Sequence, residues 1–555
     1  MRRLLPLLSA CVLLAACTGA QDPADLVLHA GRVLTLDDEG PQDATAVAVR
    51  AGRIVAVGDD AAALALRGPD TEVVDLAGAV VVPGFCDSHA HLYGLGKALA
   101  QIDLVDAGSA EECARRVAAA MAAAPGDAWL EGRGWDQNDW PDQAWPTRQQ
   151  LDAVTGGRPA YLRRVDGHAV WANSAALAAA GVTRDTPDPD GGQILRDQAG
   201  EPIGVLIDNA ADLVAAVIPA PDPAERRRRV GLAMDHCVTH GLTAVHDAGI
   251  SWDELALYRE LADRRALKLR YYGMLNDEPA TLDSAFAHGP VTTGDGMLTV
   301  RSVKLYADGA LGSRGALLLD DYADQPGHRG LAVTPHRHLA EVVLRASAAG
   351  FQVGTHAIGD AANRLVLDLY AELLAALPPG DRRWRVEHAQ ILTPADIPRF
   401  AELGVIAAMQ PVHCTSDMDW ADERLGEARL AGAYAWRSLV ESGAHVCAGT
   451  DFPVERVSAL AGLYAARTRQ HPDGTPLGGW QPQERLDGPT ALRTYTQEGA
   501  YAAFMEDELG MVRKGFRADL TVLGGDPTTC PPAELLAMPV VMTVVDGKVV
   551  HRSAP

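Results

Sequence analysis

The sequence has few aromatic residues and fewer basic than acidic ones. Phe, Trp and Tyr make up 5% of its 555 residues, which leaves little side-chain material for stacking surfaces. Lys and Arg number 49 against 73 Asp and Glu, giving a formal net charge of −24. Because a surface this acidic repels a phosphate backbone, we expect no nucleic-acid partner.

The cysteines lack the Cys-x-x-Cys spacing, which excludes the usual redox motif. Six of them lie in the body of the chain: Cys86, Cys113, Cys237, Cys414, Cys447 and Cys530. An even number in an exported protein permits disulfides, but a chain of this length does not need them. Cys86 and Cys447 lie in apolar runs, where we expect small buried thiols.

The N-terminal apolar run is too short to span a bilayer. Arg2 and Arg3 precede the apolar residues 4–14, and small residues follow. A positive start, a short apolar stretch and small residues before the cleavage point predict a secretory signal over residues 1–16.

The end of this signal resembles that of a bacterial lipoprotein. The sequence Leu-Ala-Ala-Cys ends at Cys17, which would be lipidated and would start the mature chain, with residues 17–24 as a tether. A cysteine with two lipid groups anchors a protein stably to a membrane. Because Thr18 rather than Asp follows, we expect an exported cell-envelope protein at the outer membrane, facing the periplasm or the cell surface. An ordinary signal peptide with an incidental cysteine is the alternative.

Both ends of the mature chain read as β structure. Residues 25–83 hold Val-rich runs separated by Ala-Gly-Arg and Leu-Ala-Gly turns. Residues 511–555 hold two more such runs, the second interrupted by Asp546-Gly547, a strong hairpin signal. We expect the two termini to meet in one small sheet domain.

The middle of the chain, about 84–510, alternates short apolar runs with helical stretches. This alternation predicts a parallel β/α sheet, and in a (β/α)8 barrel the active groups lie at the carboxyl ends of the strands. Residues of about 96–222 form an insertion that contains five of the ten tryptophans: Trp129, Trp135, Trp140, Trp145 and Trp171. These tryptophans form either a lid or substrate pocket, or the insertion's own core.

The sharpest local pattern is a His-x-His pair at the end of an apolar run. His89 and His91 follow Val-Val-Pro-Gly-Phe-Cys-Asp-Ser, and an i, i+2 spacing projects both imidazoles from one side of an extended segment. Two neutral imidazoles on one side suit a metal ion. Two paired structural histidines are the alternative for this motif alone.

Four further ionisable residues stand at or near the ends of separate apolar runs. They are Lys304, His356, His388 and Asp451. A barrel would aim all of them at one axis, and with the His-x-His pair they suit one or two divalent ions, with zinc the first choice. Because a protonated lysine cannot bind a cation, Lys304 fits this set only as a carbamate formed with CO2.

On these motifs the chain resembles the amidohydrolase superfamily, in the branch of YtcJ-like proteins and N-substituted formamide deformylases. The motifs run in order along nearly the whole mature chain: GFCDSHAH, RVDGHAVWANSAAL, DGGQILRDQAGEPIGVL, VKLYADGALGSRGA, THAIGDAANR, RVEHAQ, GTDFPV, RADLTVL and VVDGKVV. The resemblance implies a metal-bearing (β/α)8 TIM-like barrel beside a β-sandwich built from both termini.

The resemblance also implies a role for each residue of the set. His89, His91, His356 and His388 would be metal ligands, Asp451 a ligand and proton shuttle, and Lys304 a carbamylated bridge. The implied reaction is hydrolysis of a non-peptide C–N bond in an amide, N-formyl, N-acyl or cyclic amide substrate by metal-activated water.

Two alternatives to this reaction stay open. The same metal site would serve a deaminase or an esterase, and a surface lipoprotein that binds a ligand without catalysis is a different class. Binding alone does not require Asp451, which favours the enzyme. The expected partner is a small-molecule substrate, and a homodimer stays open.

Several other residues are weaker candidates for contact with the substrate. Trp135 and Asp136 are candidates for the pocket wall, His168 for a contact to the substrate, and Arg314 for an anchor of a substrate carboxylate. Each has a structural alternative, such as bonds to loop backbone or carbonyl caps. His246-Asp247 also ends an apolar run and is interpreted as a supporting or structural pair.

Overall fold

The computed structural model describes residues 22–123, 126–165 and 167–553. The predicted signal peptide 1–16, Cys17 and most of the tether 17–24 lie outside the described residues. Within the described part of the chain, no helix is both long and apolar enough to cross a membrane. The six cysteines of this part are free thiols, five of them buried.

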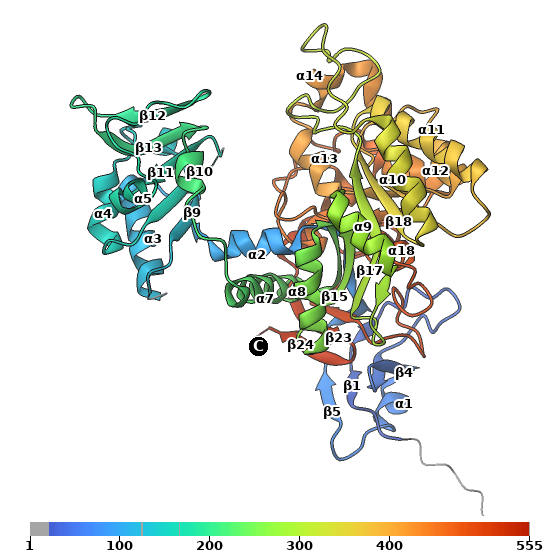
Figure 1. Ribbon diagram of the computed structural model, residues 1–555. Coiled ribbons are helices and arrows are strands. Elements are labelled where there is room, and N and C mark those ends of the chain that lie inside the picture. Colours follow the sequence, from blue (N-terminus) through green and yellow to red (C-terminus); the bar gives the residue numbers. More distant parts are fainter. Residues whose placement is uncertain (1–21, 124–125, 166, 554–555) are drawn as a thin grey trace, which may run out of the picture.

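Eight parallel strands form the centre of the molecule (Figure 1). In chain order they are β7 (Phe85–Ala90), β14 (Leu242–Ile250), β15 (Arg270–Leu275), β17 (Leu298–Tyr306), β18 (Gln352–Ala357), β19 (Arg385–His388), β20 (Ile406–Met409) and β21 (Val446–Ala448). Each pairs in parallel with its neighbour in this order. Most of their residues are buried, as expected for strands covered on both faces. The predicted barrel is confirmed.

Bonds at the carboxyl ends close the barrel between its first and last strands. The backbone N–H of Asp451 donates to the carbonyl of His89 at 2.7 Å, and that of His91 donates to Phe452 at 2.9 Å. The Asp87 carboxylate accepts the hydroxyl of Thr450 at 2.6 Å. These contacts join the two segments that carry the predicted ligands.

Helices cover the outside of the barrel between consecutive strands and after the last strand. Their bounds are α7 (Pro223–Thr239), α8 (Trp252–Asp263), α9 (Pro279–His288), α10 (His336–Ala348), α11 (Asp360–Ala376), α12 (Ile397–Leu403), α15 (Trp436–Glu441), α16 (Ala459–Thr468), α17 (Gly488–Thr494) and α18 (Gln497–Ala502). The start of α7 is typical: the Asp222 side chain accepts from the Glu225 N–H at 2.8 Å, and Pro223 occupies the first turn.

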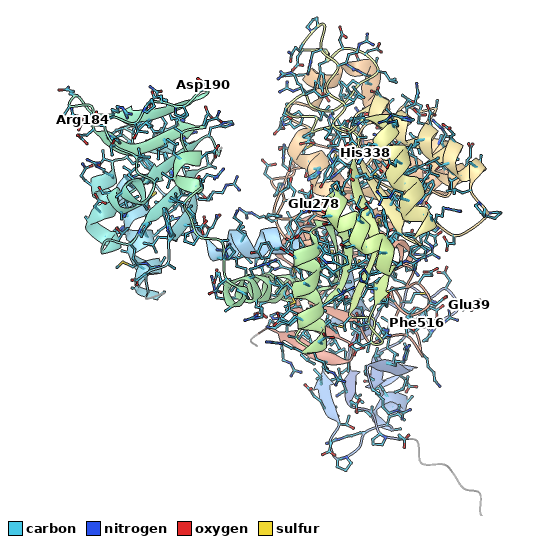
Figure 2. The ribbon with its side chains drawn as sticks, in the orientation of Figure 1. Glu39, Arg184, Asp190, Glu278, His338 and Phe516 are labelled. Atoms are coloured by element: carbon cyan, nitrogen blue, oxygen red, sulfur yellow. The ribbon has the colours of Figure 1, made fainter. Side chains whose placement is uncertain are left out.

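The two termini build a β-sandwich beside the amino ends of the barrel strands, as predicted. One sheet consists of β4 (Arg53–Gly58), β3 (Ala46–Arg50), β1 (Leu26–His29) and β5 (Glu72–Asp75); the other consists of β2 (Arg32–Val33), β6 (Val80–Pro83), β22 (Leu520–Leu523), β23 (Val540–Val545) and β24 (Lys548–Arg552). Side chains from both sheets share one core, to which Phe516 belongs (Figure 2). The predicted hairpin turn joins β23 to β24, and both Asp546 (φ 49°) and Gly547 (φ 76°) have the positive φ of a tight primed turn.

The insertion forms an outer domain to one side of the barrel (Figure 1). Its sheet consists of β12 (Gly192–Arg196), β13 (Pro202–Asp208), β11 (Ala169–Ala172), β10 (Ala160–Arg164), β9 (Leu130–Trp135) and β8 (Ile102–Asp103), with helices α3 (Ala110–Ala123), α4 (Arg148–Thr155), α5 (Ser174–Ala179) and α6 (Asp212–Ala215). Arg184 and Asp190 mark its upper edge in this view (Figure 2).

Two helices, α2 (Leu92–Ala100) and α7, connect the outer domain to the barrel. They pack closely, because a Cβ on Gly96 would lie 2.2 Å from the carbonyl oxygen of Arg229. The domain has its own core, in which Trp135, Trp140 and Trp171 are buried. For these three tryptophans the core alternative is correct, and Trp145 remains 38% exposed.

A buried ion pair fastens the barrel to the sandwich. The Arg270 guanidinium at the start of β15 donates to both carboxylate oxygens of Asp519, at 2.6 and 2.9 Å, and the two side chains are 3% and 4% exposed. Such a pair contributes little when intact, but removing one partner leaves a buried charge without compensation.

We therefore predict that Asp519→Ala lowers the free energy of unfolding by about 3–5 kcal/mol, because Arg270 stays buried and loses its main partner. Arg32→Ala is the matched control, since its pair with Asp526 also ties the termini but Arg32 is 57% exposed; it should cost less than about 1 kcal/mol. Urea unfolding followed by circular dichroism measures both. Equal losses would show that the buried pair does not fasten the sandwich.

Candidate metal centre

The six residues predicted as ligands line one cavity of about 370 Å³ at the carboxyl ends of the barrel strands. The set consists of His89, His91, Lys304, His356, His388 and Asp451, and His413 joins it. Within this set, two groups of three have ligand atoms within 4.8 Å of one another: His89, His91 and Asp451, and His388, His413 and Asp451.

His89 is oriented by a buried carboxylate. Its Nδ1 lies 2.5 Å from Oε2 of Glu387, and Arg385 donates to the same oxygen at 2.9 Å. Burial alone would raise the pKa of Glu387, but Arg385 and His89 hold it below its ordinary value. The carboxylate is therefore ionised and accepts the Nδ1–H of His89, which leaves the Nε2 lone pair facing the cavity.

Hydrogen bonds also orient the rings of His388 and His356. The Nδ1 of His388 lies 2.8 Å from Oε1 of Gln410, whose amide nitrogen donates to the Ala408 carbonyl at 3.1 Å and so fixes which end of the amide faces the ring. His356 bonds the backbone of Gly309. Its Nε2 has no hydrogen-bond partner among the described residues.

Burial keeps these three imidazoles neutral. It lowers the pKa of His89 to about 4, with help from the Lys304 ammonium, and that of His356 to about 3. It also holds the pKa of His388 well below the ordinary value. Neutral imidazoles that line one cavity fit a divalent cation of borderline hardness.

Two of the predicted ligands have an unusual backbone. His388 has a φ of 75° and Asp451 a φ of 59°, values in the left-handed region that side chains other than glycine rarely adopt. Along a regular strand, Glu387 and His388 would point to opposite sides. The turn at His388 lets Glu387 support His89 from below while His388 itself faces the cavity.

Lys304 lies among the predicted ligands, and its surroundings lower its pKa. It is 1% exposed, and its Nζ lies 3.2 Å from Nε2 of His89. Burial lowers the pKa of Lys304 to about 8. An ammonium here would repel a cation, so the residue is compatible with a metal only after it loses a proton or is modified.

Asp451 is the carboxylate of the cavity lining that contacts the histidines, and Asp417 and Glu455 also line the cavity. Its Oδ1 lies 3.1 Å from Nε2 of His91 and 3.8 Å from Nε2 of His89. Burial alone would raise its pKa, but the bond from His91 and the nearby His89 and His413 hold it well below the ordinary value. Asp451 is therefore an ionised acceptor beside the imidazoles.

Three supporting or lining residues escape the sequence prediction: Glu387, Gln410 and His413. His413 stands in α13 (Pro411–Asp417), just after β20. The apolar run GVIAAMQP before it carries the same signal that identified the other histidines. Glu387 is part of the RVEHAQ motif, but a strand pattern does not reveal that it contacts His89, a residue of a different strand.

The four weaker candidates do not meet at this cavity. Trp135 is a core residue of the outer domain, where its Nε1–H donates to Leu162 at 2.7 Å, and Asp136 pairs with Arg164. His168 lies on the surface of the outer domain, 75% exposed and 2.8 Å from Asp208. Arg314 pairs with Asp324 at 2.7 Å and does not belong to the described cavity lining.

His246 and Asp247 support the barrel rather than the cavity. The Nδ1 of His246 lies 3.0 Å from Nη1 of Arg385. Asp247 accepts the Tyr271 hydroxyl at 2.7 Å and the Leu92 N–H at 3.1 Å. Both therefore position residues next to the ligands.

Comparison with known proteins agrees with this geometry. Residues 72–551 match the Amidohydrolase family. The chain is 33% identical over 537 residues to YtcJ of Bacillus subtilis (strain 168), named as an amidohydrolase, covering 95% of this chain and 99% of that protein. It is 30% identical over 511 residues to the N-substituted formamide deformylase of Arthrobacter pascens, covering 88% and 92%. A solved structure of an uncharacterised metal-dependent hydrolase from Pyrococcus furiosus superposes with a TM-score of 0.75 at 28% identity, covering 91% of this chain and all (100%) of that one.

The arrangement of His89 predicts a specific effect of Glu387→Gln. An amide at this position can turn either its oxygen or its nitrogen to Nδ1, so the Nδ1–H tautomer is no longer imposed, and we expect metal affinity to fall about 10- to 100-fold. Competition with a chelator measures the affinity. Thermal unfolding in parallel measures the stability that is lost because Arg385 no longer faces a carboxylate. Glu498→Gln is the control, because Glu498 bonds a histidine, His445, at 2.8 Å on the surface. If both variants bind metal like the wild type, Glu387 does not orient a ligand.

Proposed function

The chain belongs to the amidohydrolase family, and on that premise we propose that it uses water to cleave a non-peptide C–N bond in a small amide. The observation that carries the proposal is the position of Asp451, an ionised carboxylate 3.1 Å from His91 and at the centre of the histidine cavity. A site for binding alone has no need of a base there.

The histidines His89, His91, His356 and His388 would hold one or two divalent metal ions, with zinc the first choice because imidazole nitrogen suits it. A bound ion of this kind supplies Lewis acidity, which polarises a carbonyl and makes a water molecule more acidic. The protein's own part is to hold neutral nitrogens in place and keep an acceptor for the proton nearby.

Asp451 is the group placed to move that proton. It accepts a proton from the water that attacks the carbonyl carbon, and returns it to the nitrogen as the C–N bond breaks. Its carboxylate faces His91, His89 and His413, so the proton stays within the cavity between the two steps.

The mouth of the cavity favours an apolar substituent on the amide. Its lining includes Tyr306, Leu311, Gly312, Trp420 and Val454, of which Tyr306 and Val454 are 36% and 67% exposed. A Cβ on Gly312 would lie 3.1 Å from the Trp420 ring, so a larger residue here would require the ring to shift. A small acyl group inside and an apolar amine outside, as in an N-substituted formamide, suit this shape.

We predict that Asp451→Asn lowers kcat by about 10²–10⁴-fold, the usual contribution of a positioned proton-transfer group. Most of the metal should remain, because the imidazole nitrogens are unchanged. The assay uses N-formyl, N-acyl and cyclic amides, with esters and deamination substrates beside them, and metal analysis of each preparation. Asp419→Asn is the control, because Asp419 is 69% exposed and pairs with His471.

Turnover of Asp451→Asn at the wild-type rate would exclude Asp451 as the proton carrier. A metal-loaded wild type that cleaves no amide in the panel would contradict the proposed reaction, and cleavage of the esters or deamination alone would replace it with that chemistry.

Lys304 is proposed to act as a carbamate. Its neutral amine would bond to the carbon of CO2 and release one proton, giving an anionic group among the ligands. Because burial lowers its pKa to about 8 from 10.5, the neutral fraction rises as the pH increases from about 6 to about 8.

We therefore expect metal-depleted protein to regain more zinc and more activity with bicarbonate than without CO2, and this gain should be larger at pH 8 than at pH 6. Lys304→Met should bind less zinc under both conditions. Lys268→Met is the control, since Lys268 forms a surface pair with Asp235. Zinc uptake that is independent of bicarbonate, together with full uptake by Lys304→Met, would contradict the carbamate.

A further inference from the structure

His413 stands at the metal centre but is held differently from the histidines around it. Its ring lies 6.1 Å from that of His388 and nearly parallel to it, at 16°. Its side chain is 11% exposed, and its Nε2 lies 3.8 Å from Oδ2 of Asp451. By position alone it could be counted as another ligand.

The hydrogen bonds at Nδ1 separate His413 from the ligands. In His89 and His388, Nδ1 faces the acceptor oxygens of Glu387 and Gln410, at 2.5 and 2.8 Å. The proton is thus on Nδ1, and Nε2 offers a lone pair.

In His413, Nδ1 faces the amide nitrogen of Gln390 at 3.2 Å. With the Gln390 amide in this orientation its nitrogen only donates, which makes Nδ1 the acceptor and puts the ring proton on Nε2. To bind a metal through Nε2, the ring would have to move its proton to Nδ1. There the proton would face the N–H of the Gln390 amide, and the hydrogen bond between the two groups would be lost.

The Nε2–H of His413 therefore points into the cavity as a donor. It is buried and has no hydrogen-bond partner among the described residues. A buried N–H without an acceptor costs about 1–3 kcal/mol, so this position is suited to an oxygen that arrives with a ligand.

We propose that His413 is not a metal ligand but the hydrogen-bond donor to the oxygen of the substrate carbonyl. This inference rests on the proposed function and assigns a residue to the developing negative charge of the reaction. As the carbonyl carbon becomes tetrahedral, its oxygen gains charge, and a fixed donor in a closed site stabilises that state more than the ground state. Gln390 is the positioning residue that keeps the proton on Nε2.

The first test is His413→Phe, which keeps a flat ring against His388 but has no donor. We expect zinc content to stay at the wild-type level, kcat on N-substituted formamides to fall about 10²–10³-fold, and KM to change much less. His445→Phe, on the 44% exposed surface pair with Glu498, is the control that should keep the wild-type rate.

The second test does not depend on turnover. Inorganic phosphate, a tetrahedral anion, is titrated calorimetrically into the zinc-loaded protein. An oxygen bonded by Nε2–H should make the wild type bind phosphate at least about tenfold more tightly than His413→Phe.

The third test is Gln390→Glu, which offers an acceptor to Nδ1 and turns the Nε2 lone pair to the cavity. It should lower kcat while it increases zinc affinity, an outcome that a purely structural Gln390 would not produce. If His413→Phe fails to fold, Gln390→Glu still tests the proposal.

Three results would overturn the proposal: loss of zinc from His413→Phe, wild-type kcat in that variant, or equal phosphate affinity. If the wild type cleaves no amide but phosphate affinity falls as expected in His413→Phe, the donor stands and the proposed reaction fails.

Discussion

The geometry of the candidate metal centre depends on a buried ion pair beneath it. The Nε of Arg385 lies 2.7 Å from Oε1 of Glu387, and both side chains are inaccessible to solvent. Arg385 also donates to the Ser88 carbonyl at 2.7 Å, one residue before His89. A buried pair of this kind contributes little to stability by itself. Its importance here is geometric, because it joins β19 to β7 and sets the tautomer of the first ligand.

Much of this architecture is readable in the sequence. The apolar runs predict the barrel strands, and each ligand follows its run because parallel strands present their carboxyl ends at one face. The Asp546-Gly547 hairpin was predictable for a local reason, since its dipeptide determines the turn. His413 follows an apolar run, as the predicted ligands do, so its position is readable in the sequence. The orientation of its ring is not readable, because Gln390, a residue of a different β/α unit, determines it.

Other features were beyond any local pattern. Glu387 and His388 are adjacent, and a regular strand would separate them. Only the left-handed turn at His388, with a φ of 75°, lets both serve the centre. The tryptophans of the insertion suggested a pocket equally well, and the structure assigns Trp135, Trp140 and Trp171 to a core. A large buried ring serves either purpose, so composition alone does not distinguish them.

The closure of the barrel has a consequence for metal binding. The bond between Asp87 and Thr450 joins residues 363 positions apart, and the segments it joins carry His89 and Asp451. Forming a contact of such long sequence separation requires closing a long loop, which costs chain entropy. His89, His91 and Asp451 therefore share one cavity only when the long intervening chain is in place. A metal ion held by all three residues would therefore bind only to a protein whose barrel is closed.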